Sequence, residues 1–298
     1  MEIINIDLVK MLIKKQFPKW DDLEIKAVSN MGHDNRTFHL GEDMSIRLPS
    51  GKDYALQAEK EQKWIPKLKE ELKVKIPEII AKGNKCEEFP YVWSICSWID
   101  GDIAKRENIS NMNEFAKDLA EFLVSLQAID CSDGPIAGKH NFYRGGDILV
   151  YNDEYIWLVN ELEDYLNIEK DLLNEIWELA LNSKWKKNNV WVHGDMAPTN
   201  ILILNGKLEA IIDFGILGVG DPACDLAMYW TFFKGEEREV FKNILELDKE
   251  TWNRARGWVL WKALYDINYY KDSDKVKCSY AKEIFNEVIE EYKNLINN

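Results

Sequence analysis

Three side chains stand at a spacing that suits phosphoryl transfer. Asn200 follows Asp195 by five residues, and Asp213 follows Asn200 by thirteen. A carboxylate can orient an attacking hydroxyl and accept its proton. An amide oxygen and a second carboxylate can bind the Mg²⁺ that bridges the β- and γ-phosphates of a nucleotide. The spacing therefore predicts a catalytic base, Asp195, and two Mg²⁺ ligands, Asn200 and Asp213.

The stretches around this set are typical of short strands joined by tight turns. Residues 190–192 lead into the loop, residues 200–204 lead out of it, and residues 207–212 return. Between the last two lies Asn205-Gly206, a strong signal for a two-residue β-hairpin. We therefore expect both aspartates at the same end of neighbouring strands. For each residue alone the alternative is an ordinary turn role, because Asp and Asn are common where strands end.

Three motifs, taken in order, resemble those of the aminoglycoside phosphotransferase family. They are His193-Gly194-Asp195 with Asn200, then Ile212-Asp213-Phe214-Gly215, and then residues 221–227, Asp-Pro-Ala-Cys-Asp-Leu-Ala. Gly194 stands where protein kinases carry Arg, which favours the small-molecule branch. The resemblance implies a two-lobed, protein-kinase-like fold of the α+β class. It also implies that Asp225 braces the catalytic loop.

The resemblance implies how the chain divides. Residues 1–98 would form an N-terminal nucleotide-binding lobe, an antiparallel sheet plus a helix. Residues 99–298 would form a larger, mainly helical C-terminal lobe for catalysis and substrate binding. With 298 residues, 46% of them hydrophobic, the chain can fill two cores. From residue 111 the apolar period is helical, with further helical patterns near residues 160–181, 223–246, 250–270 and 276–295.

The phosphates of the nucleotide are expected in the N-terminal lobe. The loop with Gly32 and Asn35 resembles the family's phosphate-covering turn, although an ordinary hairpin turn would also explain it. Arg47 stands where most relatives carry the phosphate-binding Lys, and its planar guanidinium is larger than an ammonium group. Glu61 is expected to pair with Arg47, and Glu59 is the competitor.

The base of the nucleotide is expected at the hinge between the lobes. By the resemblance, Cys96 would lie at the back of the purine pocket, and the backbone of residues 97–99, with Trp98 at its centre, would pair with the base. Leu202 and Ile212 would form the floor. A plain core strand shows the same alternation of large apolar residues, so the residues themselves indicate only where the hinge lies.

Composition argues against several classes of function. The formal net charge of −14 argues against nucleic acid as a partner. No apolar run approaches the roughly 18 residues of a membrane span, and the first residues lack a signal-peptide layout, so we expect a cytoplasmic protein. Five cysteines without a Cys-x-x-Cys motif favour reduced thiols, and the four histidines show no zinc spacing.

Charge is unevenly distributed along the chain. Residues 1–100 hold 17 acidic and 16 basic side chains, so residues 101–298 carry 13 of the 14 net negative charges. An acidic cleft would concentrate a small cationic, hydroxylated substrate, although a helical surface facing water is often acidic too. We expect Asp266, on a helix rich in Trp and Tyr, to contact this substrate together with Asp195. Core packing is the alternative for the aromatic residues.

These observations predict an O-phosphotransferase that uses ATP or GTP with Mg²⁺. The expected acceptor is a small hydroxylated molecule, with an aminoglycoside antibiotic as first choice, which would make the reaction one of resistance by phosphorylation. The alternatives are a kinase of another small alcohol, such as a macrolide, choline or homoserine, and a nucleotide-binding pseudoenzyme. Protein kinase activity is disfavoured, because residues 213–221 form too short a segment to dock a peptide.

Overall fold

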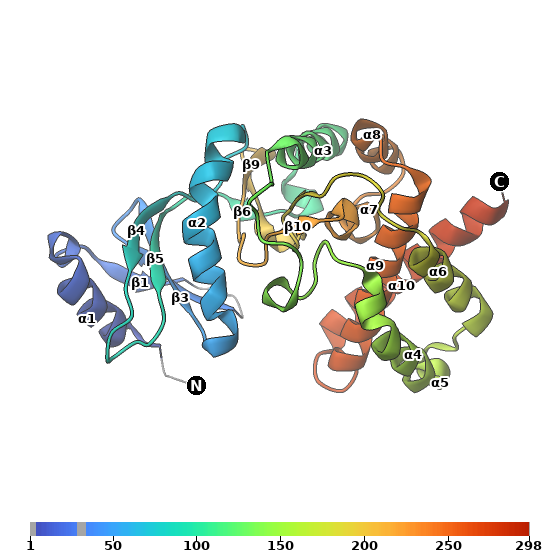
Figure 1. Cartoon of the computed structure of the whole chain (residues 1–298), viewed down its shortest axis with the longest axis horizontal. Helices are drawn as coiled ribbons and strands as arrows, with labels where there is room; N and C mark the ends of the chain where they lie inside the picture. Colours follow the sequence, from blue (N-terminus) through green and yellow to red (C-terminus); the bar gives the residue numbers. More distant parts are fainter. Residues whose placement is uncertain (1–3, 29–33, 298) are drawn as a thin grey trace.

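Two lobes lie side by side in the structure, a computed structural model that describes residues 4–28 and 34–297 (Figure 1). The smaller lobe contains a five-stranded antiparallel sheet in the order β1-β2-β3-β5-β4. Its strands are β1 (Ile25–Ala27), β2 (Asn35–Leu40), β3 (Met44–Pro49), β4 (Ile79–Gly83) and β5 (Trp93–Ser97), accompanied by helices α1 (Ile6–Gln16) and α2 (Ala55–Glu71). The predicted antiparallel sheet with a helix is confirmed.

Two apolar cores are present, and helix α2 belongs to the larger one. In the smaller core, α1 residues such as Val9 pack with sheet residues such as Phe38. The apolar face of α2 instead joins the core of the other lobe, where the ring centroids of Trp64 and Trp191 lie 5.1 Å apart. Helix α2 is therefore a structural element that both lobes share.

The larger lobe is mainly helical, as predicted. Its helices are α3 (Met112–Ala128), α4 (Asn152–Glu161), α5 (Glu163–Leu166), α6 (Lys170–Asn182), α7 (Met228–Thr231), α8 (Glu236–Leu245), α9 (Lys249–Tyr270) and α10 (Lys275–Asn297). The pattern near residues 160–181 is interrupted, because Asn167 has a φ of 51° and ends α5. Gly235, with a φ of 53°, likewise separates α7 from α8. Left-handed residues cannot continue a right-handed helix.

The predicted hairpin is confirmed, with one correction to its neighbours. Strands β8 (Ile201–Leu204) and β9 (Lys207–Ile211) pair through Asn205 and Gly206, whose φ values of 52° and 79° suit a type I′ turn. Strand β6 (Asp102–Ile103) extends this sheet. We expected β7 (Val190–Val192) to lie beside the hairpin. It pairs instead with β10 (Gly218–Gly220). A partner that comes 26 residues later in the chain cannot be inferred from local patterns.

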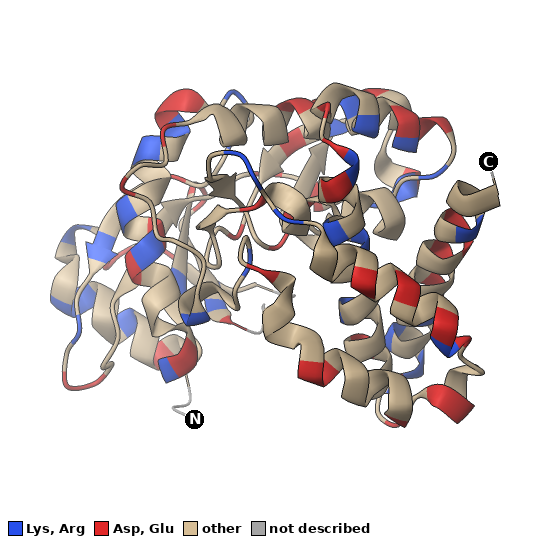
Figure 2. Cartoon of the chain, turned by 45° about the vertical axis from the view of Figure 1, so that its right-hand side comes forward, with Lys and Arg blue, Asp and Glu red and all other residues tan. Residues whose placement is uncertain are grey.

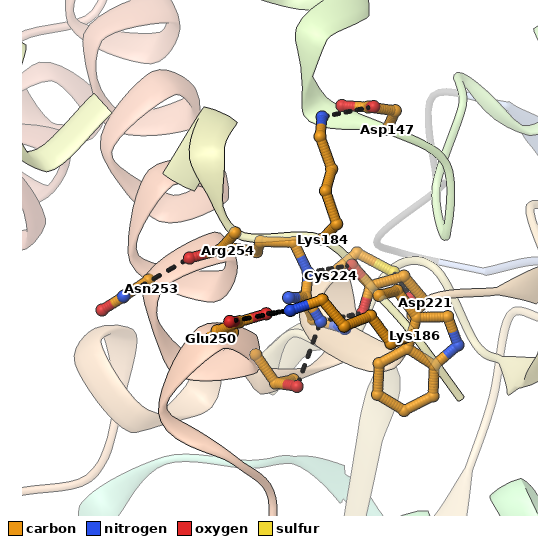
Figure 3. Close-up of polar contacts among 12 residues, drawn as sticks. Asp147, Lys184, Lys186, Asp221, Cys224, Glu250, Asn253 and Arg254 are labelled. Carbon is orange, nitrogen blue, oxygen red and sulfur yellow. Dashed lines mark hydrogen bonds and ion pairs between the residues drawn. The ribbon is translucent and has the colours of Figure 1, made fainter. Parts of the chain in front are cut away.

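Helix α9 is fixed in the larger lobe by two buried arginines. Arg254 binds Asp221, with Nε–Oδ2 at 2.6 Å and Nη2–Oδ1 at 3.1 Å (Figure 3). Arg256 binds Glu291 of α10, with Nε–Oε2 at 2.6 Å. These two buried pairs link α9 to the loop beginning at Asp221 and to α10, and each buried charge has an opposite charge beside it.

No helix within residues 4–28 and 34–297 is long and apolar enough to cross a membrane.

The Arg254 pair gives a test of how α9 is held. Arg254→Met leaves the buried Asp221 carboxylate unpaired and should lower the free energy of unfolding by about 3–5 kcal/mol in urea titrations. The double variant Arg254→Met/Asp221→Asn should recover part of this loss. Lys186→Met breaks an exposed pair with Glu250, also drawn in Figure 3, and should cost less than about 1 kcal/mol. Equal stability of the Arg254 and Lys186 variants would contradict this account.

Candidate active site

A buried carboxylate holds the loop that carries Asp195. Asp225 is only 1% exposed, in the 3-10 helix η7 (Pro222–Leu226). Its two oxygens accept hydrogen bonds from the backbone N–H groups of His193 and Gly194, both at 2.7 Å. Burial raises the pKa of Asp225, while His193 and the two N–H donors oppose that rise. The bracing role expected for Asp225 is confirmed.

Gly194 is required by the shape of this loop. Its φ is +86°, and a Cβ at this position would lie 2.7 Å from the carbonyl oxygen of Ile216. Any larger residue would therefore be strained both by its backbone conformation and by contact with the neighbouring segment. This explains why the position that protein kinases fill with Arg carries Gly here.

Asp195 and Asn200 lie together, and the amide nitrogen of Asn200 donates to Asp195. Nδ2 of Asn200 donates to Oδ2 of Asp195 at 2.8 Å and to its backbone oxygen at 2.9 Å. Asp195 is exposed, whereas Asn200 is buried. Since Nδ2 is committed to Asp195, Oδ1 is the atom of Asn200 that could bind a cation.

The backbone joins this pair to the segment that carries Asp213. The N–H of Ile212 donates to the carbonyl oxygen of Asn200 at 2.9 Å, and Nε2 of His193 lies 3.0 Å from the carbonyl oxygen of Ile212. Asp213 has a φ of +65°, a conformation that Asp and Asn tolerate better than most residues. The structure thus brings together the three residues predicted for base and metal binding, although β7 is not in the hairpin sheet.

Arg47 lies between two carboxylates. Its Nη2 is 2.8 Å from Oδ1 of Asp213, and its Nη1 is 3.3 Å from Oε1 of Glu61. Glu61 is therefore the partner of Arg47 on α2, whereas Glu59 lies 3.5 Å from Lys85. Arg47 thus neutralises part of the negative charge at the position predicted for Mg²⁺.

The burial of this charge cluster shifts its ionisation equilibria. Burial raises the pKa of Glu61, and the positive charge of Arg47 opposes the rise. Burial works to lower the pKa of Arg47, but the carboxylates of Glu61 and Asp213 outweigh it, and the net pKa is raised. The thiol of Cys96, which lies beside this cluster, has a pKa raised to about 12 by burial. Arg47 is therefore a permanent cation, and Cys96 a neutral thiol.

Most backbone N–H groups of the predicted hinge, residues 97–99, already have backbone acceptors. The N–H groups of Ser97 and Trp98 donate to the carbonyl oxygens of Glu78 and Asp43 at 2.9 and 2.8 Å. Of residues 97–99, only Ile99 has an N–H without a backbone acceptor among the described residues. The N–H of Ile99 is therefore the hinge donor that a base could use.

The other residues predicted for the base fall around the hinge. Cys96 is 1% exposed on β5 opposite Ser45, and Leu202 lies under Gly101, where an added Cβ would be 3.0 Å from the Cβ of Leu202. The indole of Trp98 lies next to His39, with ring centroids 3.9 Å apart and the planes tilted by 45°, and it donates to Asp100 at 2.9 Å.

The phosphate loop is described only at its end. Gly32 lies outside the described residues, so its predicted role stays a prediction. Asn35 is the first residue of β2; it is buried, and its Nδ2 has no hydrogen-bond partner among the described residues. An orphaned buried donor is costly unless a ligand satisfies it, which is compatible with the expected phosphate contact.

Next to Asp195, a cavity of about 460 Å³ opens in the larger lobe. Its walls come from the catalytic loop, from α9 and from α10, and its lining is mostly apolar, including Met196, Pro198, Trp258, Val259, Ala263 and Ile284. Asp266 lines this cavity together with Asp195, as predicted for the acceptor site, but it forms an ion pair with Lys262.

Sequence analysis missed the positive charges in this cavity. Arg144 and Lys262 both line it. The guanidinium of Arg144 lies 5.0 and 5.5 Å from the ring centroids of Trp258 and Trp261. No local motif marks Arg144, because its place in the cavity depends on the fold.

The aromatic residues of α9 divide between cavity and core. Trp252 packs with Tyr229 and Trp230 in the core, as the core-packing alternative expected. Trp258 lines the cavity, and a series of neighbouring rings continues outward through Trp261 to Tyr265.

The oxygen ligands available here suit Mg²⁺. No cluster of three or more His, Cys, Asp or Glu side chains arranged for a metal was found in the described part of the chain. One carboxylate and one amide oxygen, from Asp213 and Asn200, are nevertheless the hard donors that Mg²⁺ uses when nucleotide phosphates and water complete its shell.

Comparison with known proteins agrees with this geometry. The chain is 27% identical over 157 residues to an aminoglycoside 3'-phosphotransferase of Enterococcus faecalis, an alignment covering 49% of this chain and 56% of the relative. It is 25% identical over 165 residues to the uncharacterized protein YcbJ of Bacillus subtilis (strain 168), covering 53% of this chain and 47% of that one. The chain thus spans about half the length of these curated relatives.

Solved structures show the same fold. The GDP complex of wild-type aminoglycoside 2'-phosphotransferase-IIIa has a TM-score of 0.72 at 18% identity, covering 97% of this chain and 100% of that one. The macrolide 2'-phosphotransferase MphH from Brachybacterium faecium has a TM-score of 0.63 at 18% identity, covering 94% and 97%. Other similar structures were solved with ADP, or with streptomycin and ATP.

A family model described as the phosphotransferase enzyme family matches residues 24–258. That range contains the catalytic loop, the Asp213 segment and the hinge, and it covers most of the chain. The resemblance seen in the motifs is thereby confirmed, and the chain belongs to the phosphotransferase enzyme family.

Proposed function

We propose that this protein transfers the γ-phosphoryl group of ATP or GTP to a hydroxyl of a small molecule bound in the cavity beside Asp195. One observation carries the proposal. The Asp195 carboxylate lines the acceptor-sized cavity and, through Asn200 and Ile212, is joined to the segment that carries Asp213. A base for the acceptor and oxygen ligands for a metal-bound nucleotide thus lie in one continuous site.

In the proposed reaction, Asp195 orients the acceptor hydroxyl and takes its proton as the hydroxyl oxygen bonds to the γ-phosphorus. The bond from that phosphorus to the bridging oxygen breaks, and the nucleoside diphosphate leaves with the electron pair. Asn200 and Asp213 would hold Mg²⁺, which when bound neutralises charge on the phosphate oxygens. Arg47 would add a second positive charge there, and Glu61 keeps it in place.

The two lobes would divide the substrates between them, with the boundary near residue 98. The N-terminal lobe and hinge would bind the nucleotide through Gly32, Asn35, Arg47 and Cys96, with Trp98 in the hinge and Leu202 and Ile212 below the base. The similar structures solved with GDP, ADP and ATP support a nucleoside triphosphate as donor.

The cavity lining favours an acceptor with an extended apolar face over a polycation. Its charged residues are two cations, Arg144 and Lys262, and two acids, Asp195 and Asp266, with Asp266 already paired. The acidic residues of the larger lobe are spread over its helices (Figure 2). A macrolide-like acceptor therefore suits the walls best, because apolar surface is most stable against apolar surface.

An aminoglycoside is the second candidate acceptor. The relative from Enterococcus faecalis and the solved aminoglycoside phosphotransferases support it, as does the net charge of −13 beyond residue 100, which would attract cations at long range. For this candidate, Asp266 would have to exchange Lys262 for an amine of the substrate.

The roles of Asp195 and Asp213 can be separated by conservative substitution. Asp195→Asn should lower turnover about a hundredfold or more with little change in nucleotide affinity, because it removes the base but keeps the shape. Asp213→Asn should weaken binding of the magnesium nucleotide in calorimetry. Asn, like Asp, tolerates the left-handed backbone at this position. Normal binding and turnover in both variants would contradict the site assignment.

The proposed phosphate contact of Arg47 can be tested by substitution, including to the Lys that most relatives carry at this position. Arg47→Ala should raise the dissociation constant of the nucleotide about tenfold or more, and Arg47→Lys should recover only part of the loss. Because removal of Arg47 leaves Glu61 buried and unpaired, the matched control is Arg47→Ala/Glu61→Gln. Burial raises the pKa of Glu61 above its unfolded value, so Arg47→Ala should lose stability as pH rises through that raised pKa. Unchanged nucleotide affinity in all three variants would place Arg47 outside the phosphate site.

The acceptor class can be identified by a panel that includes macrolides, kanamycin, gentamicin, choline and homoserine, with nucleoside diphosphate release as the measurement. We expect a macrolide to be phosphorylated, and its apparent KM should change little with salt concentration. If kanamycin is the better substrate and its apparent constant rises steeply with salt, the second candidate is correct, since only exposed opposite charges are screened in this way. Phosphorylation of an anionic alcohol alone would contradict both.

A further inference from the structure

One face of α2 packs against the segment that begins at Asp213. A Cβ at Gly215 would lie 2.6 Å from Oε1 of Gln57, so that glycine packs directly against this helix. Glu61, one turn further along, lies 3.3 Å from Nη1 of Arg47, whose Nη2 binds Asp213 at 2.8 Å. Lys60, between them on the same face, reaches the carbonyl oxygen of Leu217 at 3.1 Å. Residues at spacings of three and four lie on one side of a helix, so one side of α2 contacts this segment at more than one point.

Lys60 also contacts a second segment of the larger lobe. Its Nζ lies 3.1 Å from Nδ1 of His140 and 3.2 Å from the carbonyl oxygen of the same residue. With Leu217 this makes three acceptors, which matches the three N–H donors of an ammonium group. No carboxylate of the described residues lies within ion-pair distance of Lys60. An ammonium group held only by neutral acceptors is uncommon, because burial of a charge is costly without an opposite charge.

The state of His140 is determined by its other nitrogen. Nε2 lies 2.9 Å from the carbonyl oxygen of Ile136, which can only accept, so Nε2 carries the proton and Nδ1 is free to accept from Lys60. Burial lowers the pKa of His140, and the charge of Lys60 lowers it further, against the opposing effect of the backbone acceptor of Ile136. The neutral imidazole of His140 can therefore accept from Lys60 through Nδ1.

We propose that Lys60 is a positioning residue that ties α2 to the segment after Asp213 and to the turn at His140, and so keeps Glu61 and Arg47 beside Asp213. Lys60 lies next to Glu61 in the chain, so any movement of the helix away from Leu217 also withdraws Glu61 from Arg47. Lys60 itself touches neither reacting atom nor substrate. Its importance for catalysis rests on the proposed phosphotransferase function, whereas the tie between the lobes does not.

The tie should depend on pH in a defined direction. Burial lowers the pKa of Lys60 to about 8, against the opposing effect of Glu61. The titratable groups that face Lys60 are Glu61 on α2 and His140 on the turn, while the Leu217 segment offers only a carbonyl oxygen. Below this pKa the ammonium group satisfies all three acceptors. Above it the amine has two N–H groups, and one acceptor loses its donor.

Hydrogen exchange tests the tie without any substrate. In Lys60→Met, amides of residues 139–142 and 214–219 should exchange about tenfold faster than in the wild type, because these segments open more often once the Lys60 contacts are lost. The matched control is Lys63→Met, an exposed lysine on the same helix. Wild-type exchange in both segments of Lys60→Met would overturn the proposal.

Turnover tests the positioning role, with hydrolysis of ATP and GTP by water as the probe reaction. Lys60→Met should lower kcat about tenfold with little change in the KM of the nucleotide, and Lys63→Met should do neither. In the wild type, kcat should fall as pH rises through about 8, and this limb should be absent from Lys60→Met. An unchanged kcat, or a limb retained in Lys60→Met, would overturn the positioning role.

A second variant keeps the test decisive if Lys60→Met does not fold. His140→Ala removes one acceptor and should give a smaller effect of the same kind, while His140→Gln can still accept from Lys60 and donate to Ile136 and should behave as the wild type. Equal behaviour of these two variants would count against the tie. If the wild type hydrolyses neither nucleotide and phosphorylates no acceptor, the proposed function fails, and hydrogen exchange still decides whether the tie exists.

Discussion

Two consecutive backbone N–H groups donate hydrogen bonds to the buried carboxylate of Asp225, and the rest of the site depends on this constraint. It holds His193 and Gly194 at 2.7 Å each, and the left-handed Gly194 lets the chain pass close to Ile216. This fixes the direction in which Asp195 leaves the loop. Burial raises the pKa of Asp225, and these two N–H donors and the neighbouring His193 oppose that rise, so the loop and its support stabilise each other.

The second constraint is the sharing of α2 between the lobes. Its apolar side packs in the larger core through Trp64, while its polar side pairs with Arg47 of the smaller sheet. A helix with partners in both lobes transmits their relative position to Asp213. The charges of Glu61, Arg47 and Asp213 alternate in sign, so each is stabilised by its neighbour. Removing Arg47 would leave the buried Glu61 carboxylate without its positive partner, near the carboxylate of Asp213.

The charge of the cavity lining differs from the net charge of the lobe that contains it. Residues 101–298 carry a large negative net charge, yet the lining beside Asp195 combines Arg144, the paired Lys262 and Asp266, and apolar walls. Exposed carboxylates are spread over helical surfaces, where water screens them. A molecule bound in the cavity contacts the local lining. The long-range electrostatic field of the lobe affects mainly the association rate.

The sequence by itself determined the features that depend on local chemistry: the motif spacing, the Asn205-Gly206 hairpin turn and the helical periods. These follow from backbone preferences and side-chain periods that act within a few residues. Only the tertiary structure decided the pairing of β7 with β10, the positive charge of Arg144 in the cavity and the contact of Lys60 with Leu217, 157 residues apart. Such neighbours are chosen by the packing of whole elements against one another, and no short stretch of the chain carries that information.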